Sequence, residues 1–286
     1  MSTPLFGTAG TSESFKTMGY KTSAQVPQYT AAMGLDAFEY QCGRGVRLGE
    51  ALAKTIRDGA ETHGIYFSLH APYYISMSSM EEEKRLNSVD YILQSAAAVR
   101  ALGGRRVIFH AGSCGKQSRE EALAKALDTM ARMQAALDEA GFEDITLCPE
   151  TMGKVGQLGT LDEVLALCKV DKRITPCIDF GHLNARDGGW IKGEEQYAFI
   201  LDRMAEELGD ERAVNFHAHF SRIEYTTGGE KRHLTFEDTV FGPPFEPLLE
   251  VLHRRGLAPV IICESAGTQA EDAAAMKRYY QSLSEG

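Results

Sequence analysis

Short apolar runs alternate with longer amphipathic segments along the whole chain, and this pattern predicts strands separated by helices. Helical spacing of apolar residues is clear in two segments, one with Leu123, Leu127, Met130 and Leu137, the other with Leu86, Val89, Leu93 and Ala97. Strands that alternate with helices pair in parallel through right-handed crossovers. The eight runs interpreted as strands are Pro4–Thr8, Ala37–Gln41, Tyr66–His70, Arg106–His110, Thr146–Glu150, Thr175–Asp179, Ala213–His219 and Pro259–Glu264.

Helix boundaries support the same division of the chain. Ser118 with Glu121 and Thr160 with Glu163 have capping-box spacing, and Gly141 and Gly256 stand where helices should end. Eight units without a linker predict an α/β protein that forms a single (β/α)8 TIM barrel domain over residues 1–286. The alternative is an open doubly wound sheet, but no G-x-G-x-x-G follows the first run and no Walker A sequence is present.

Composition narrows the class of protein. Hydrophobic residues make up 43% of the 286, which is ample for a buried core, and no apolar run approaches the ~20 residues of a membrane span. Residues 1–15 lack a basic segment followed by an apolar one, so we expect a cytoplasmic protein with no membrane contact. No obligate protein partner is inferred. The net charge of −10 argues against broad nonspecific nucleic-acid binding but is compatible with a local basic rim.

The six cysteines show no C-x-x-C pair, and several lie inside apolar runs. We therefore expect buried, reduced thiols rather than disulfides or a thiolate metal site. Cys148 and Cys177, which share a strand face with Glu150 and Asp179, are interpreted as small barrel fillers. The cysteines are Cys42, Cys114, Cys148, Cys168, Cys177 and Cys263.

Metal-capable side chains gather at the ends of the predicted strands. Of the eight histidines, only His63 and His253 lie in helix-like segments. In a closed barrel the strand ends converge on one mouth, where active sites are built. Buried charges at one mouth would repel unless cations joined them, and imidazole with carboxylate suits zinc, manganese or iron. The side chains concerned are His70, His110, Glu150, Asp179, His182, His217, His219, His233 and Glu264.

Two ions a few ångströms apart activate a water molecule and stabilise the oxygen that leaves phosphorus, and they need a bridging ligand. Glu150 is the candidate bridge and catalytic residue, because its strand lies between the fourth and the sixth in barrel order. His217 and His219 point to the same strand face, so the sequence leaves open which one binds metal; we favour His219.

Several motifs, in order, resemble those of the endonuclease IV family, also called AP endonuclease family 2, within the xylose-isomerase-like TIM barrels. They run from the third strand to the eighth. The motifs are FSLHAPYYISMSS with His70 and Tyr73, FHAGS with His110, PETMGKVGQLGT with Glu150, CIDFGH with Asp179 and His182, HFS with His219, KRH with His233, and CES with Glu264.

The resemblance implies a zinc-dependent hydrolase with two or three zinc ions, or manganese in their place. One ion would be held by His70, His110 and Glu150, a second by Glu150, Asp179, His219 and Glu264, and a third by His182 and His233. The partner it implies is DNA with abasic sites, cut 5′ to the lesion in base excision repair. The damaged nucleotide would be flipped into the pocket. Tyr73 would line the DNA face, and Arg44 would contact backbone phosphate.

Two positions depart from the family pattern. The Asp-Arg-His motif near the third ion reads Lys231-Arg232-His233 here, and a protonated lysine is a poor ligand. Glu230 could replace the missing carboxylate only if the local backbone shifts. After His219, Ser221 and Arg222 stand where the family has Asn-Asp.

Two other functions stay open from the sequence. A sugar isomerase or epimerase of the same superfamily would use one metal, with Glu150 and Glu264 as an acid–base pair and Asp179 and one histidine as further ligands. A relative that binds metal or damaged DNA without turnover is the third possibility. The number of metal ions per chain discriminates among the three.

Overall fold

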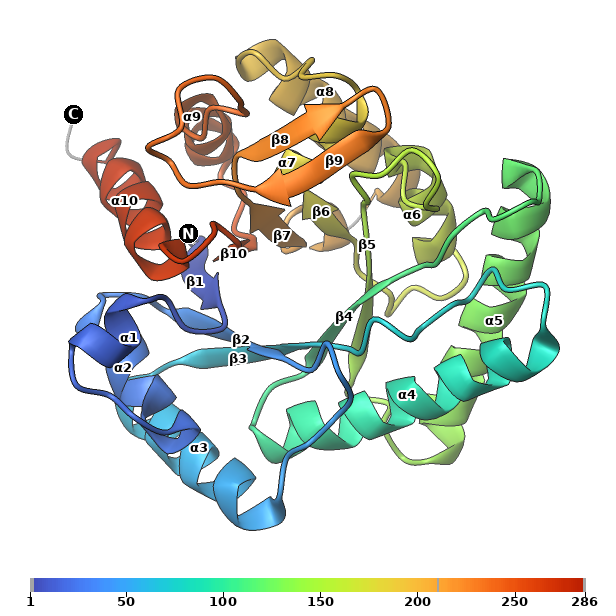
Figure 1. Cartoon of the computed structure of the whole chain (residues 1–286), viewed down its shortest axis with the longest axis horizontal. Helices are drawn as coiled ribbons and strands as arrows, with labels where there is room; N and C mark the ends of the chain where they lie inside the picture. The colour runs from blue at the N-terminus through green and yellow to red at the C-terminus, as the bar shows by residue number, and fades with distance from the viewer. Residues whose placement is uncertain (1–2, 210, 285–286) are drawn as a thin grey trace.

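The chain folds into a closed parallel barrel, which confirms the predicted TIM barrel. The computed structural model describes residues 3–209 and 211–284. Its strands follow one another in the order β1-β10-β7-β6-β5-β4-β3-β2 around the barrel (Figure 1). The barrel strands are β1 (Leu5–Ala9), β2 (Ala37–Gln41), β3 (Tyr66–His70), β4 (Arg106–His110), β5 (Thr146–Glu150), β6 (Cys177–Asp179), β7 (His217–Phe220) and β10 (Val260–Cys263).

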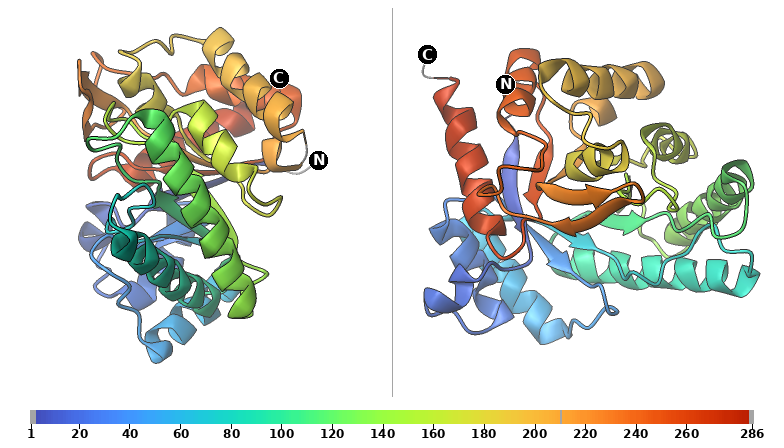
Figure 2. Two further views of the ribbon diagram at one scale, coloured as in Figure 1. Left: turned by 90° about the vertical axis from the view of Figure 1, so that its right-hand side faces the viewer. Right: turned by 45° about the horizontal axis from the view of Figure 1, so that its top comes forward.

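Helices surround the barrel, and both described ends of the chain lie on the same side of it (Figure 2). None of the described helices has the length and apolar character needed to cross a membrane. The helices are α1 (Ser14–Thr17), α2 (Val26–Ala32), α3 (Glu50–His63), α4 (Glu82–Ala101), α5 (Arg119–Glu139), α6 (Leu161–Cys168), α7 (Phe180–Arg186), α8 (Glu194–Leu208), α9 (Glu246–Arg255) and α10 (Gln269–Ser282).

Four strands, β2 to β5, have the bounds predicted from the sequence. The bounds of the other four, β1, β6, β7 and β10, differ from the prediction. The first strand is displaced by one residue from Pro4–Thr8, and the last is shorter than Pro259–Glu264. The sixth begins at Cys177 instead of Thr175, since Pro176 has no N–H to give to a ladder. The predicted run Ala213–His219 begins as a short 3₁₀ helix (Glu211–Ala213), and the strand starts only at His217.

Helix ends follow the predicted signals. Both capping boxes form: Ser118 Oγ accepts from the Glu121 N–H at 3.2 Å, and Thr160 Oγ1 accepts from the Glu163 N–H at 3.2 Å. The helical spacing of Leu86, Val89, Leu93 and Ala97 lies within α4, as predicted, although Leu86 is 47% exposed. The core-facing side of α4 is formed by Ser88, Ile92, Ala96 and Val99. The buried Ser88 is tolerated because its hydroxyl donates to the Lys84 carbonyl within the helix.

An antiparallel hairpin, β8 (Ile223–Thr226) and β9 (Gly229–His233), follows β7 and was not predicted. It lies beside α7 in front of the barrel (Figure 1). Its pairing slips by one residue: Glu224 pairs with Arg232 but Tyr225 pairs with Glu230, so Lys231 is an extra residue in β9. This β-bulge decides which side chains of β9 face the barrel mouth.

The six cysteines are free and buried, as predicted. Cys148, Cys177 and Ile108 pack together inside the barrel. This packing agrees with the interpretation of Cys148 and Cys177 as small residues that fill the barrel.

Candidate metal centre

The carboxyl ends of the strands bring the predicted residues to one mouth. His70, His110, Glu150 and Asp179 are the last residues of β3, β4, β5 and β6. Parallel register sets His110 beside Glu150, and Asp179 beside His219 on β7. Three groups result, in each of which the donor atoms lie within 4.8 Å of one another: His70, His110 and Glu150; Glu150, Asp179, His219 and Glu264; His182, Glu230 and His233.

Glu150 lies at the centre of these groups and contacts histidines from four elements. Its Oε2 is 3.2 Å from His70 Nε2 and 3.3 Å from His110 Nε2. Its Oε1 is 3.1 Å from His182 Nδ1 and 3.2 Å from His219 Nδ1. Each oxygen therefore faces a different pair of ring nitrogens, which is the arrangement a carboxylate needs in order to bridge two cations.

The carboxylate of Glu230, and not the side chain of Lys231, lies beside His182 and His233. Glu230 Oε2 lies 3.4 Å from His182 Nε2, and its Oε1 lies 3.8 Å from His233 Nε2. Lys231 and Arg232 both turn away from the mouth and pair with Glu224, at 2.5 and 2.6 Å. The bulge at Lys231 thus puts Glu230 and His233, three residues apart, on the same face of β9. The shift that Glu230 requires is built into the hairpin.

Hydrogen bonds outside the groups fix the orientation of the rings. His70 Nδ1 lies 2.9 Å from the Ala71 carbonyl, which assigns the proton to Nδ1 and leaves Nε2 facing Glu150. His182 Nδ1 lies 3.0 Å from the Thr151 carbonyl, and Nε2 then faces Glu230. Ser221, which stands with Arg222 where the family has Asn-Asp, holds His233 through its Oγ, 2.8 Å from Nδ1. Arg222 donates to the Asp238 carbonyl and has a structural role.

The charges of the mouth depend on one another. Burial raises the pKa of Asp179 to about 6. Burial lowers the pKa of His182, but Asp179 and Glu150 outweigh it and raise that pKa to about 10. Burial likewise raises the pKa of Glu150, yet His219 and the hydrogen bond from His110 hold it well below its usual range. At neutral pH the metal-free mouth thus contains a protonated His182 beside buried carboxylates.

The donor set fits divalent cations. Asp179 Oδ2 is buried and accepts no hydrogen bond from the described residues, although His182 Nδ1 lies 3.2 Å away. A buried carboxylate oxygen without a donor is costly unless a cation satisfies it. The mixture of imidazole and carboxylate donors at one mouth is typical of zinc, manganese and iron sites.

The predicted substrate residues lie at the rim. A cavity of about 550 Å³ opens above the metal-capable residues, and its lining includes Tyr73, Lys154 and Gln157. Tyr73 is 61% exposed, and its ring lies 5.5 Å from that of His110. Arg44 lies outside this cavity, in an adjoining groove that Tyr73 also lines. Tyr73 therefore lines both the cavity and the groove, whereas Arg44 lines only the groove.

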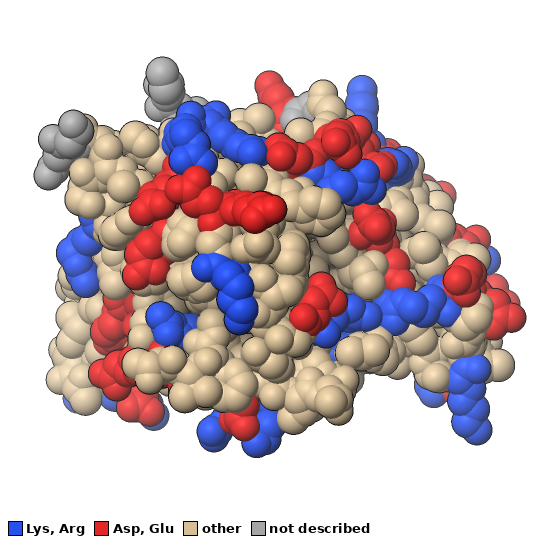
Figure 3. All heavy atoms as spheres, turned by 90° about the horizontal axis from the view of Figure 1, so that it is seen from above, with Lys and Arg blue, Asp and Glu red and all other residues tan. Residues whose placement is uncertain are grey.

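Two arginines position the loop after β5 that carries Lys154 into this cavity. Arg186 Nη1 donates to the Lys154 carbonyl at 2.8 Å, and Arg119 Nη1 donates to the Val155 carbonyl at 2.9 Å. Acidic and basic side chains are interspersed over the face of the molecule drawn in Figure 3. Lys154, the basic side chain in the lining of the cavity, is placed by a loop that these two arginines hold.

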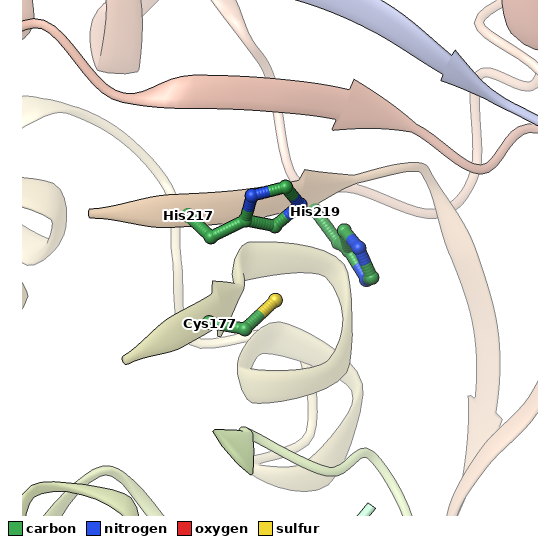
Figure 4. Close-up of side chains that lie close together, drawn as sticks. All are labelled: Cys177, His217 and His219. Atoms are coloured by element: carbon green, nitrogen blue, oxygen red, sulfur yellow. The ribbon is translucent and has the colours of Figure 1, made fainter. Parts of the chain in front are cut away.

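A second polar cluster lies one layer deeper in the barrel, and sequence reasoning largely missed it. Cys177 on β6 points toward His217 and His219 on β7 (Figure 4), and the donor atoms of the three lie within 4.8 Å of one another. Glu39 on β2 is fully buried and lies 2.9 Å from His217 Nε2. Burial lowers the pKa of His217 to about 4, so its ring is neutral.

His219, and not His217, reaches the group of Glu150. The only signal for Glu39 was a carboxylate between the aromatic residues Phe38 and Tyr40.

A parallel barrel with histidines and carboxylates gathered at its strand ends defines the class, a TIM barrel with a candidate metal centre at its mouth. The family model for the xylose isomerase-like TIM barrel matches residues 27–282, and the chain belongs to that family. An uncharacterised protein of Methanocaldococcus jannaschii is 33% identical over 275 residues, covering 96% of each chain. The probable endonuclease 4 of Acholeplasma laidlawii is 26% identical over 250 residues, covering 79% of this chain and 81% of the other.

Solved structures share the fold. Endonuclease IV from Thermus thermophilus superposes with a TM-score of 0.68 at 22% identity, covering 99% of this chain and 100% of the other. A D-tagatose 3-epimerase-like protein superposes with a TM-score of 0.70 at 20% identity, covering 98% of each chain. The fold is thus common to proteins named as nucleases and as epimerases, and function has to be argued from the site.

Proposed function

We propose that this protein is a zinc-dependent phosphodiesterase that hydrolyses DNA on the 5′ side of abasic sites, as endonuclease IV does, in base excision repair. The observation that carries the proposal is the set of three donor groups, two of which share Glu150 while the third adjoins it through His182. A single ion would leave most of these buried donors unused. The curated relatives named probable endonuclease 4 support the same activity.

In this proposal His70, His110 and Glu150 hold one ion, Glu150, Asp179, His219 and Glu264 a second, and His182, Glu230 and His233 a third. Ions held there would activate a water molecule and stabilise the charge that develops on phosphate oxygens. The protein's own residues orient the ligands, exclude bulk water from the buried donors and offer Tyr73 as a surface on which a sugar or base can stack.

The substrate would enter at a rim that carries basic side chains despite the overall charge of −10. Lys154 lines the mouth cavity, and Arg44 and Arg47 line the adjoining groove. Phosphate contacts from such residues position a nucleic-acid backbone without reading its sequence. This arrangement suits an enzyme that recognises a lesion and not a base sequence.

The test is cleavage of a duplex oligonucleotide that carries one synthetic abasic site, beside an undamaged duplex. We expect a cut 5′ to the lesion that leaves a 3′-hydroxyl and disappears after prolonged chelation. Glu150→Gln should lower the rate roughly a thousandfold, since metal-ion stabilisation is worth several kcal/mol. Glu61→Gln changes an exposed glutamate on α3 and serves as the matched control. Metal-loaded protein that leaves the damaged duplex intact would refute the proposal.

A sugar isomerase or epimerase is the second candidate, and one observation favours it. Glu150, Asp179, His219 and Glu264 form a single group that contains two glutamates, an aspartate and a histidine. One ion with a pair of glutamates is enough to move a proton on a ketose. This function would leave His70, His110, His182, Glu230 and His233 without a role, so the nuclease is the better account. Interconversion of ketohexoses by the metal-loaded protein would reverse that preference.

A further inference from the structure

Glu39 is a buried carboxylate that the proposed chemistry does not use. It lies in the middle of β2 on the inward face, below the strand ends, and is 0% exposed. Its carboxylate reaches across the barrel to β7, where Oε1 lies 3.1 Å from His219 Nε2 and Oε2 lies 2.9 Å from His217 Nε2. A carboxylate that is buried this deeply stays ionised only where hydrogen-bond donors surround it.

Donors occupy the whole acceptor capacity of this carboxylate. Besides the two histidines, Ser68 Oγ donates to Oε2 at 3.1 Å, and Gln41 Nε2 donates to Oε1 at 3.1 Å. Ser68 stands directly beside Glu39 in the register of β2 and β3. A carboxylate has about four lone-pair sites, and four donors fill them. Glu39 therefore acts as a hydrogen-bond acceptor within the barrel, with no oxygen left over to bind an ion.

His219 connects this carboxylate to the mouth, because its two nitrogens face opposite ways. Nε2 faces Glu39, while Nδ1 lies 3.2 Å from Glu150 Oε1 and 3.6 Å from Glu264 Oε1. Both nitrogens face acceptors, so a cation at the mouth requires the Nδ1 proton to leave and the Nε2 proton to stay. A carboxylate on the far nitrogen of a metal-binding histidine enforces that choice and orients the ring.

We propose that Glu39 is a positioning residue for the metal centre: it holds the Nε2–H of His219, so that the Nδ1 lone pair faces the ion shared by Glu150, Asp179 and Glu264. This inference rests on the metal centre of the proposed function, and it is independent of the substrate. Ser68 and His217 help to hold the Glu39 carboxylate in place.

An ion bound by Cys177, His217 and His219 is the competing use of the same residues. Such an ion would need a nitrogen of His219, whose Nδ1 faces the mouth groups and whose Nε2 faces Glu39. The hydrogen bonds to Glu39 favour the positioning role, and the ion count decides between the two.

The first test compares Glu39→Gln with Glu61→Gln by competition of the metal-free protein with a chromophoric chelator for Zn²⁺. Glutamine matches the shape of glutamate but puts an amide NH₂ against N–H donors. We expect Glu39→Gln to bind one ion 10- to 100-fold more weakly, on the order found for such outer residues. Glu61→Gln makes the same change at an exposed glutamate on α3 and should leave the zinc affinity unchanged. Circular dichroism shows whether each variant is folded.

The second test needs no variant of Glu39. In zinc-loaded natural protein, ¹⁵N NMR of the histidine rings should show His219 protonated at Nε2 and unprotonated at Nδ1, with the signal assigned by its loss in His219→Gln. A proton on Nδ1, or zinc affinity in folded Glu39→Gln equal to that of the natural protein, would overturn the inference. A zinc ion lost selectively in Cys177→Ser would overturn it in favour of the deeper cluster. Natural protein that binds no zinc would instead refute the proposed function.

Discussion

Asp179 and His182 are buried neighbours at the barrel mouth, and burial and charge shift the pKa of each. His182 Nδ1 lies 3.2 Å from Asp179 Oδ2, and the Asp179 side chain also accepts the His182 backbone N–H at 2.6 Å. In the metal-free protein Asp179 has a pKa of about 6, and His182 one of about 10. Both must be unprotonated to bind an ion, so metal binding at neutral pH releases a proton from His182.

We predict that zinc affinity falls with decreasing pH and that the fall becomes steeper below about pH 6. Above that point a proton of His182 competes with the ion held by His182, Glu230 and His233, which gives about a tenfold loss of that ion's affinity per pH unit. Below it a proton of Asp179 competes with the ion held by Glu150, Asp179, His219 and Glu264, which adds about a tenfold loss per unit to the affinity for that ion. Chelator competition between pH 5 and 8 measures this profile. Asp179→Asn, which cannot titrate, should lose the steeper part; a profile unchanged by it would contradict the assignment.

Among the elements, the β8–β9 hairpin shows how one extra residue in a strand changes which side chains share a face. Lys231 is the extra residue of the bulge, and it pairs with Glu224 on the outer face. Removing Lys231 from the sequence would leave Glu-Arg-His, with the acid two residues before His233. In a regular strand, residues two apart share a face. The bulge and the shorter sequence therefore present the same acid and histidine to the mouth.

Deletion of Lys231 should accordingly leave the number of bound zinc ions unchanged, whereas Glu230→Gln should lose one. The deletion restores regular pairing, and the substitution removes the carboxylate that lies 3.4 Å from His182 Nε2. Elemental analysis of dialysed protein gives the count, and Lys231→Ala is the control for loss of the lysine charge. A deletion variant that loses an ion, together with Glu230→Gln that keeps all of them, would contradict the role of Glu230 as a ligand.

The same elements show what the sequence can and cannot predict. His70, His110, Glu150 and Asp179 were predictable because each ends an apolar run, and parallel strands bring their ends together. Glu230 was not, since a bulge leaves no mark in a motif such as Lys231-Arg232-His233. Glu39 lies in mid-strand, and its partners other than Gln41 are 29 to 180 residues away, so only the folded barrel reveals them.

At the scale of the whole molecule, the barrel concentrates like charges where water is scarce. Glu39, Glu150 and Asp179 are all buried within one barrel, in a chain whose net charge is already −10. Burial raises the pKa of Asp179 to about 6, so the charge of this carboxylate is held in the barrel at a cost in stability. Cations at the mouth would relieve this cost.

Removal of metal should therefore lower the melting temperature substantially. An ion present at a thousand times its Kd stabilises the fold by about 4 kcal/mol. In a chain of this size each kcal/mol shifts Tm by about 2 °C, so a loss of at least ~8 °C is expected on full chelation. Differential scanning calorimetry of loaded and chelated protein measures it. Glu150→Gln should show a much smaller difference, and equal shifts in both proteins would mean that the metal acts elsewhere.

The most direct test of the whole account is the number and position of zinc ions in the natural protein. Crystals of zinc-loaded protein, measured above and below the zinc absorption edge, would give both from anomalous differences. We predict three peaks per chain, one in each donor group, with the carboxylate of Glu150 between the first two. One peak among Glu150, Asp179, His219 and Glu264, with the other groups empty, would contradict the nuclease and support the epimerase. No peak at the mouth would contradict the metal centre itself.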